Sequence, residues 1–376
     1  MPVYLDCNAT TPIEPEVAEV VEFYLREEFG NSGSRTHEYG NTAKRAVQVA
    51  RSEVAALVNC NSEEVIFSSG ATESNNMAIL GLAAYGEQEG RRHLITSSIE
   101  HKAVLEPFEE LERRGFEVSY LKAEPSGQVA PGTLNDALRV DTLLVSLMQV
   151  NNETGIRQPI EEYCDVLADH PAFFHVDAAQ GFGKIVEPLQ NQRIDLISAS
   201  AHKIYGPKGV GSLVARRRGY DRLPLAPLMV GGGQERGLRP GTLPVPLIAG
   251  FGKAVELARS RHVERRRVCS AIKTKALEAL NSLNPSFTGN QDFVSEHVLH
   301  VSFAGLNSEA AIVSLKDLIA ISNGSACTSS SYTPSHVLLS QGMTEEEANQ
   351  CLRISWCHLT EEVDWEEVAA RIQAML

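Results

Sequence analysis

The sequence lacks any pair of cysteines at the close spacing of a redox or zinc motif. Its seven cysteines are an odd number, and no Cys-x-x-Cys occurs among them. This pattern argues against a disulfide framework and indicates no metal site, so we expect reduced thiols and no bound metal. The cysteines stand at positions 7, 60, 164, 269, 327, 351 and 357.

Leader-like segments and long apolar runs are also missing. The first residues, MPVYLDCNATTP, contain no basic start followed by an apolar run, so we expect no signal peptide. The longest stretch without a charged side chain, residues 318–344, is rich in Ser, Thr, Gly and Asn, which excludes it as a membrane span. We therefore expect a cytoplasmic protein without membrane contact.

Basic residues are in the minority. The chain has 34 Lys and Arg against 48 Asp and Glu, a net charge of −14. Such a surface repels nucleic acid, so we expect no direct contact with it. Apolar residues make up 43%, as in globular proteins, and 376 residues suffice for two or three domains.

What the sequence does contain, from about residue 60 to 220, is a series of short apolar strands, most of them separated by helical patterns. The strands show little alternation, as expected for strands buried on both faces, and the series predicts an α/β fold with a mostly parallel sheet. Only the ten residues AHKIYGPKGV join the last two strands, which are therefore expected to be antiparallel neighbours or to pair through an intervening strand. The predicted strands are 64–69, 93–98, 117–121, 142–150, 173–178, 195–200 and 211–216.

The pattern changes after residues 231–244, GGGQERGLRPGTLP. A long helix is predicted over about 245–282, followed by strands at 296–303, 318–322 and 351–355 with helices between them. This order predicts a second, smaller α+β domain.

Polar groups follow several of the predicted strands, at the edge where open α/β sheets bind ligands. The segment SSGATESNN, residues 68–76, follows a strand and opens a helix. There the backbone of Ala71 and the hydroxyl of Thr72 are expected to form a phosphate cradle at the positive end of the helix. The alternative is an ordinary helix cap supplied by Thr72 or Ser74.

Further candidates end neighbouring strands. Asp177, in HVDAAQ, is costly at a buried strand end unless it meets a cation, which is either a protonated pyridine nitrogen or an Arg or Lys. Lys203 follows His202 in SASAHKIYGPKG, where a lysine is either ion-paired at the surface or bound covalently to a cofactor aldehyde. Asn152 and His101 follow two more strands, although a lone His at a helix start is often only a cap. Together these groups predict a site for pyridoxal 5'-phosphate.

Cys327 lies in the segment ISNGSACTSSSYTPS, residues 321–335. The neighbouring small polar residues give this thiol little to pack against. Because cysteine is usually buried, the setting argues against a packing role and favours a reactive thiol on an adaptable loop.

The motifs in their order along the chain resemble those of the NifS/IscS-type cysteine desulfurases, which belong to the class V aminotransferase group of fold-type I enzymes. The resemblance covers about residues 3 to 360 and favours the subgroup with a Ser-Ser-Gly-Ser-Ala-Cys loop, here with Asn323 at the second position. It implies a homodimer that converts L-cysteine to L-alanine and passes sulfur to an acceptor protein. The motifs are YLDCNATTP, SSGATESNN, EHKAV, VNNETG, HVDAAQ, SASAHKIYGPKG, GGGQERGLRPGTLP and NGSACTSSS.

The resemblance also implies the role of each residue. Lys203 binds the cofactor covalently and moves the Cα proton, His101 stacks on the cofactor ring and relays a proton, and Cys327 takes the sulfur as a persulfide. Asn152 and Arg353 hold the substrate carboxylate. Asp177 pairs with the pyridine nitrogen, Gln180 touches the phenolic oxygen, and the phosphate is held by Ala71, Thr72, Ser200, His202 and, from the other subunit, Thr242.

We expect a large cofactor-binding domain over residues 12–250 and a small domain made of residues 1–11 and 251–376, which carries the Cys327 loop. The sequence departs from the family pattern at ISWCH, residues 354–358. Many relatives have Ser-Leu-Gly here, so Trp356 stands in place of the Leu and Cys357 in place of the Gly. Cys7 also stands where relatives often have Tyr or Asn, with a packing role or a second reactive thiol as alternatives.

Two rival functions and the acceptor stay open at this point. A selenocysteine lyase, or another lyase or aminotransferase of the same fold, has no need of the Cys327 loop, and a scaffold without activity has no need of Lys203. The acceptor is an iron–sulfur scaffold, a tRNA-thiolation enzyme or the machinery of DNA phosphorothioation. Two features favour the machinery of DNA phosphorothioation. One is the segment PLMVGGGQERGLRPGTLP, and the other is the end of the chain at Leu376, where housekeeping iron–sulfur relatives continue into a longer tail.

Overall fold

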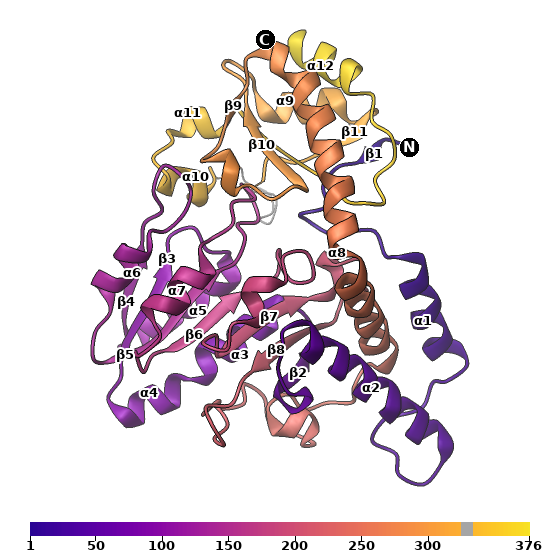
Figure 1. The fold of residues 1–376 in the computed structure, drawn as a ribbon, viewed down its shortest axis with the longest axis vertical. Helices are drawn as coiled ribbons and strands as arrows, with labels where there is room; N and C mark the ends of the chain where they lie inside the picture. The colour runs from indigo at the N-terminus through magenta and orange to yellow at the C-terminus, as the bar shows by residue number, and fades with distance from the viewer. Residues whose placement is uncertain (325–333) are drawn as a thin grey trace.

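The structure is a computed structural model and describes residues 1–324 and 334–376. Figure 1 shows a larger part built around a twisted sheet and a smaller part above it, joined by the long helix α8 (Val245–Leu280). Cys327 lies outside the described residues.

The larger part contains the predicted seven-stranded sheet, in the order β2-β8-β7-β6-β5-β3-β4. β8 is antiparallel to both of its neighbours, and the other neighbouring pairs are parallel. The first of the two arrangements predicted for the last two strands is therefore confirmed, because β7 and β8 pair directly. The strands are β2 (Val65–Ser68), β3 (His93–Ser97), β4 (Glu117–Leu121), β5 (Thr142–Met148), β6 (Phe173–Asp177), β7 (Leu196–Ser200) and β8 (Gly211–Ala215).

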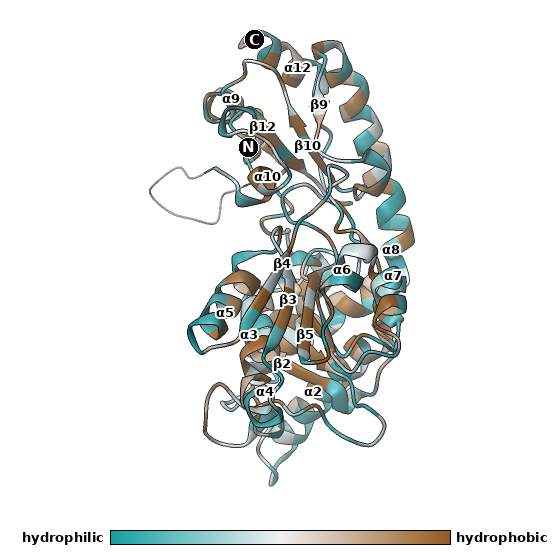
Figure 2. Ribbon diagram, turned by 90° about the vertical axis from the view of Figure 1, so that its left-hand side faces the viewer, coloured by the Kyte–Doolittle hydropathy of each residue, from teal (hydrophilic) through white to brown (hydrophobic). Residues whose placement is uncertain are grey.

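Both faces of this sheet are buried, which explains why its strands read as continuous apolar runs. Successive residues of a strand belong to the hydrophobic cores on opposite faces of the sheet. Val145 of β5 belongs to the core formed with helices α2, α7 and α8, whereas its neighbour Leu144 belongs to the core formed with α3 and α5. The apolar colouring of the strands in Figure 2 reflects this burial. The helices of this part are α1 (Pro15–Arg26), α2 (Glu38–Leu57), α3 (Ala71–Gly81), α4 (Ala83–Glu89), α5 (Lys102–Arg113), α6 (Pro131–Ala137) and α7 (Ile160–Val166).

The smaller part is α+β, as predicted, and has its own core. An antiparallel sheet runs in the order β12-β10-β9, and the N-terminal strand β1 pairs in parallel with β11. The predicted strand at 318–322 shortens to two residues. Its elements are β1 (Val3–Tyr4), β9 (Ser286–Phe287), β10 (Val298–Ser302), β11 (Ile319–Ala320), β12 (Cys351–Ser355), α9 (Ser308–Leu315), α10 (His336–Ser340), α11 (Glu345–Ala348) and α12 (Trp365–Gln373).

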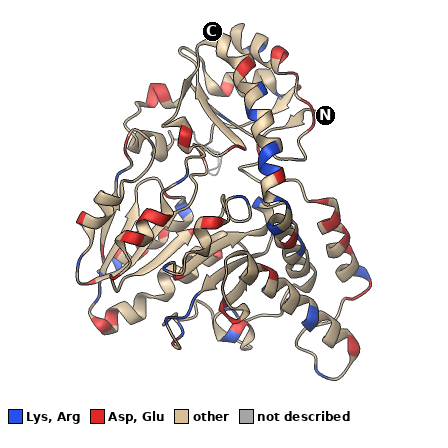
Figure 3. Cartoon of the chain, viewed as in Figure 1, with Lys and Arg blue, Asp and Glu red and all other residues tan. Residues whose placement is uncertain are grey.

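The predicted domain boundaries, 11/12 and 250/251, stay predictions; α8 runs unbroken through the second of them. Charged side chains are distributed over the helices of both parts, with Lys and Arg along α8 and acidic residues on α1 (Figure 3). Within the described residues, no helix combines the length and the apolar character needed to cross a membrane. The same residues contain no group of three or more His, Cys, Asp or Glu arranged to hold a metal ion.

Candidate active site

A cavity of about 590 Å³ lies where the parallel strands of the large sheet end, beneath the smaller part. Its walls come from both parts of the chain, because Arg353 lies on β12 and Asn8 follows β1, whereas the other polar groups belong to the large sheet and its loops. The predicted residues that line it are Ala71, Thr72, His101, Asn152, Asp177, Gln180, Ser200, His202, Lys203 and Arg353. Thr242 is exposed and does not line the cavity.

The sheet itself brings these residues together. β2, β5, β6 and β7 run in one direction, so the residues that end them meet at one edge. Asp177 is in register with Met148 of β5 and Ser198 of β7. The sequence predicted this convergence from the strand pattern alone.

Asp177 is buried, and no Arg or Lys of the described residues forms an ion pair with it. None of the ion pairs found among the described residues includes it. Its two oxygens accept hydrogen bonds from the Asn75 side chain at 2.8 Å and from the Ala179 backbone at 2.9 Å. The carboxylate is thus held in place by neutral donors and faces the cavity, so its charge is available to a cationic ligand.

Lys203 ends the short turn Ala201–Lys203 that follows β7. Its Nζ donates to the backbone oxygen of Asn8 and, at 2.8 Å, to that of Ala9. The N-terminal segment therefore holds the amine at the cavity wall. Lys102, the other strand-end lysine in the sequence motifs, is exposed and does not line the cavity.

Both histidines of the site are held neutral by burial. His101 is the N-cap of α5 and its Nδ1 accepts from the Ala103 N–H at 3.0 Å, so the neutral ring carries its proton on Nε2. Burial lowers its pKa, and Asp177 opposes that shift. Burial also lowers the pKa of His202 to about 4, and its Nδ1 lies 3.1 Å from the Thr10 hydroxyl. His101 therefore caps a helix and faces the cavity at once.

The start of α3 presents N–H groups at the cavity wall that bond no side chain of the described residues. Its N-cap is Gly70, which makes no side-chain cap, and the Ser74 hydroxyl bonds the Ser68 hydroxyl at 2.7 Å instead. The capping alternative for Thr72 and Ser74 is therefore wrong, and the first N–H groups of the helix remain available to an anion. Gly211 allows the close packing here, since a Cβ on it would stand 2.7 Å from the Gly70 Cα.

Arg353 lies buried at the opposite side of the cavity. One of its terminal nitrogens, Nη2, donates to Asp6 Oδ1 at 2.7 Å, and the other, Nη1, donates to the backbone oxygens of Asn152 at 3.0 Å and Gly324 at 3.4 Å. Its Nε is buried and bonds no described residue. The guanidinium is thus oriented by protein groups while one donor is left unused.

The departure at residues 354–358 leaves this arrangement intact. Trp356 is buried in the core of the smaller part, where its Nε1 donates to the Cys269 backbone oxygen at 2.9 Å. Cys357 packs against Cys7 and Tyr205. Neither Trp356 nor Cys357 lines the cavity.

Sequence reasoning missed two residues that orient the site. Asn75 holds Asp177 and Asp6 holds Arg353. Asn75 was within the quoted motif SSGATESNN, one turn into its helix, and Asp6 was the single acid beside an apolar N-terminal strand, so each had a signal. Their partners lie 102 and 347 residues away, however, and only the fold reveals such pairings.

Several buried acceptors at the cavity bond no described residue. In Asn8, Asn75 and Gln180 the amide nitrogen donates to a protein oxygen, so these side chains are oriented while their amide oxygens stay unused. Buried polar atoms usually have partners, so a polar ligand is expected between them. The acceptors are Asn8 Oδ1, Asn75 Oδ1, Asn152 Oδ1 and Gln180 Oε1.

Comparison with known proteins defines the class to which this fold and cavity belong. The profile of the family "Aminotransferase class-V" matches residues 3–368. The chain belongs to this family, whose members are pyridoxal-phosphate enzymes.

Within the family, the relatives of this chain include cysteine desulfurases. Cysteine desulfurase IscS of Vibrio vulnificus is 44% identical over 97% of this chain and 91% of the relative. The crystal structure of DndA from Streptomyces lividans is 50% identical, with a TM-score of 0.83 over 93% of this chain and 98% of that one. A NifS-like protein is 35% identical, with a TM-score of 0.90 over 100% of this chain and 98% of that one. The prediction of an enzyme of the NifS/IscS type with the fold-type I architecture is confirmed.

Proposed function

We propose that this protein is a pyridoxal-phosphate-dependent cysteine desulfurase that converts L-cysteine to L-alanine and collects the sulfur as a persulfide on Cys327. The observation that carries the proposal is the single cavity in which Lys203, Asp177 and His101 from one part of the chain face Arg353 from the other. SspA, whose structure is known in complex with cysteine, is 38% identical to this chain and supports the substrate assignment.

The residues present fit the cofactor. The N-terminus of α3 with Ala71 and Thr72, together with Ser200 and His202, would hold the phosphate, and Asp177 would face the pyridine nitrogen. Gln180 would reach the phenolic oxygen, and His101 would lie on the ring. When bound, the cofactor supplies an electron sink for the carbanion formed at the substrate Cα.

The chain's own residues carry the remaining steps. Arg353 and the Asn152 side chain bind the substrate carboxylate, and Asp6 keeps the guanidinium facing it. Lys203 Nζ, held beside Asn8 and Ala9, removes the Cα proton and later returns one. His101, neutral with its proton on Nε2, is the second group able to pass a proton at this face.

The sulfur step falls to Cys327, which lies outside the described residues. Its assignment is supported by where the flanking residues lie. Gly324, before the segment, accepts from Arg353, and Ser335, after it, donates from its hydroxyl to Glu153 at 2.5 Å. Both ends of the segment are therefore fixed next to the cavity. The Cys327 thiolate attacks the substrate sulfur, and the Cα–Cβ unit leaves as alanine after reprotonation.

We propose a cytoplasmic homodimer in which Thr242 reaches the phosphate site of the partner subunit. In support, Thr242 is exposed and the preceding loop carries apolar residues outward, with Val230 92% exposed and Leu228 42% exposed. Exposed apolar groups of this kind are typical of subunit contacts.

The acceptor is proposed to belong to DNA phosphorothioation or to iron–sulfur cluster assembly. Identity is 50% to the DndA structure and 44% to IscS of Vibrio vulnificus, in keeping with the resemblance of the motifs to phosphorothioation desulfurases. With a net charge of −14, we expect DNA to be contacted by partners and not by this chain.

Mass spectrometry of the protein after incubation with L-cysteine, without reductant, tests the proposal. We expect one added sulfur on the peptide that contains Cys327, together with an equal amount of alanine. Sulfur on another cysteine, while Cys327→Ser remains active, would disprove the assignment. Release of selenium from selenocysteine by Cys327→Ser, without turnover of cysteine by the wild type, would instead establish the lyase alternative.

A further inference from the structure

A cluster of three buried thiols lies behind the active-site cavity, against α8. Cys7 and Cys357 are each 1% exposed and pack on Tyr205, and Cys269 of α8 is near them. The chain brings Cys7 and Cys357 together through backbone pairing, since the Cys7 N–H donates to the Ser355 oxygen at 3.0 Å. No residue of this cluster lines the active-site cavity.

The two thiols of Cys7 and Cys357 are not equivalent. The Cys7 S–H donates to the Cys357 sulfur, which is the main reason that the pKa of Cys357 is lowered. The Thr360 hydroxyl adds a second donor, 3.8 Å from the same sulfur. The same hydrogen bond raises the pKa of Cys7. Cys357, which has the additional donor, is therefore the sulfur better able to carry a negative charge and attack, and Cys7, packed beside it, is the sulfur placed to resolve.

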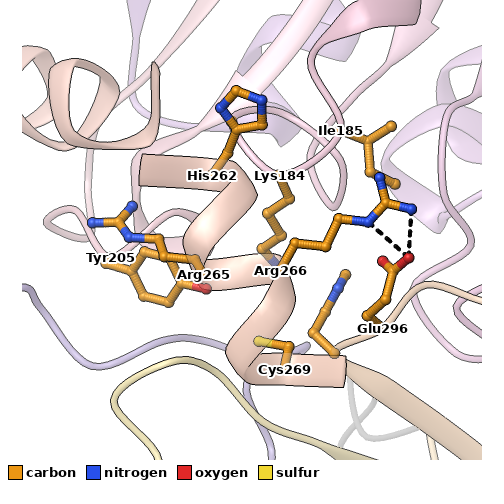
Figure 4. Close-up of a pocket in the computed structure, with 10 residues that line it drawn as sticks. Lys184, Ile185, Tyr205, His262, Arg265, Arg266, Cys269 and Glu296 are labelled. Carbon is orange, nitrogen blue, oxygen red and sulfur yellow. Dashed lines mark hydrogen bonds and ion pairs between the residues drawn. The ribbon is translucent and has the colours of Figure 1, made fainter. Parts of the chain in front are cut away.

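A small cavity and a buried amine lie on the Cys269 side of this cluster; neither Cys7 nor Cys357 lines the cavity, but Tyr205, which does, packs on both thiols. Lys184 Nζ is buried and bonds no described residue. Burial lowers the pKa of this amine, and the three nearby sulfurs act in the opposite direction. Figure 4 shows Lys184 running toward α8, on which Cys269 lies. The cavity of about 30 Å³ that Lys184, Tyr205 and Cys269 line is close to the volume of one or two water molecules. Hydrogen peroxide is a molecule of that size and polarity.

We propose that Cys7 and Cys357 are a peroxide-reactive dithiol that forms a disulfide in the folded protein. The Cys357 thiolate attacks one oxygen of hydrogen peroxide, which breaks the O–O bond, leaves a sulfenic acid and releases hydroxide. The Cys7 sulfur then attacks the Cys357 sulfur, and the departing hydroxide takes the Cys7 proton to form water. The two sulfurs together lose two electrons, and the peroxide gains them.

The disulfide is placed to alter the active site without touching the substrate. Asn8 and Ala9 directly follow Cys7, and their backbone oxygens hold Lys203 Nζ. A disulfide requires the two sulfurs to approach to about 2.05 Å, closer than any non-bonded contact, so residues on both sides of the bond must shift. This chemistry is independent of the desulfurase reaction, because neither Lys203 nor Cys327 takes part in it.

The test uses the full-length holoprotein with Cys327→Ser, so that peroxide cannot act on the proposed catalytic thiol. After treatment with hydrogen peroxide, the unreacted thiols are alkylated and the peptides are mapped without reduction. We expect a linked pair of peptides that contains Cys7 and Cys357, lacks two hydrogen atoms and is restored by dithiothreitol. Cys164 is the matched control, since it is 2% exposed but burial raises the pKa of its thiol to about 12.

The rates decide the outcome. Loss of alkylatable thiol at Cys357 should be at least about tenfold faster than at Cys164, because a thiolate and not a thiol reacts. Cys7→Ser, in the same background, should abolish the cross-link and leave Cys357 as the sulfenic or sulfinic acid. Equal rates at Cys357 and Cys164, no cross-link, or a cross-link from Cys357 to Cys269 would overturn the proposal. Because all readouts are covalent, they hold whether or not the protein proves to be a desulfurase.

Discussion

Asp177→Asn tests the electrostatic centre of the proposed mechanism with almost no change of shape. Asp177 is buried, accepts from two neutral donors and forms no ion pair with a described residue. The replacement keeps one oxygen for the Ala179 N–H. Its new amide can donate to Asn75 Oδ1, an acceptor that bonds no described residue at present, once the Asn75 side chain flips. We therefore expect the protein to fold with nearly unchanged stability.

The cost falls on the chemistry. A carboxylate and a protonated pyridine nitrogen about 3 Å apart attract by about 5.5 kcal/mol at an effective dielectric constant of about 20. The neutral amide keeps a hydrogen-bond acceptor, so we expect about half of this energy, close to 3 kcal/mol, to be lost from stabilisation of the reacting state. Since about 1.4 kcal/mol corresponds to a factor of ten, turnover should fall by about 100-fold.

The assay is alanine formation per bound cofactor, with cofactor content measured by absorbance. Asp195→Asn is a suitable control, because Asp195 is equally buried at 5% exposure but pairs with Arg193 and Arg218 at the other end of the strands. That change breaks a buried ion pair, so it should lower the free energy of unfolding by about 3 kcal/mol and leave turnover per cofactor unchanged. Alanine production by Asp177→Asn within about threefold of wild type, at full cofactor content, would refute the role of the charge.

Four further changes have distinct expected outcomes. Lys203→Ala should abolish turnover and the borohydride-sensitive yellow colour together, and retained colour would move the covalent attachment to another lysine. Cys327→Ser should bind cofactor and L-cysteine, seen as a spectral change, yet release no alanine or sulfide; continued alanine release would exclude its role. Asp6→Asn should raise the KM for cysteine by about tenfold with little change in kcat, because the guanidinium of Arg353 loses a charged hydrogen bond worth about 1.5 kcal/mol. An unchanged KM would contradict this role of Asp6. Burial raises the pKa of Glu100 to about 8, so between about pH 4.5 and 8 the folded state binds a proton that the unfolded state has lost. The free energy of unfolding should therefore fall as the pH rises through this range. Urea unfolding at several pH values should show a smaller fall for Glu100→Gln than for the wild type.

The sheet and most of the site were predictable because they depend on local patterns. The apolar runs at 142–150 and 173–178 are buried on both faces, so their sequence carries the strand signal directly, and the groups that end them had to meet at one edge. Lys203 and Asp177 were found this way. The strand at 318–322 was predicted too long. Only two of its residues pair with β1, a strand from the other end of the chain, so its length depends on a distant partner and not on its own sequence.

What escaped prediction depends on contacts between distant parts of the chain. Asp6 and Arg353 meet only because the N-terminal segment runs beside β12, as the bridge between Asp6 and Ser355 shows. The pairing of Cys7 with Cys357 has the same origin. Asp6, Cys7 and Cys357 each stand out in the sequence, but periodicity and spacing do not tell which distant residue each of them meets, and three-dimensional proximity must supply that.

The continuous helix α8 has a consequence for how the enzyme responds to its substrate. At 36 residues and about 1.5 Å per residue it is a rod of about 54 Å, anchored in the large core at Phe251 and in the small core at Ala276. Residues of both anchored parts line the cavity, Arg353 on one side and Lys203 on the other, so a bend in this rod would change their separation. A substitution on its solvent face that stiffens or bends it would tune substrate affinity from a distance, with every residue that contacts the substrate left unchanged.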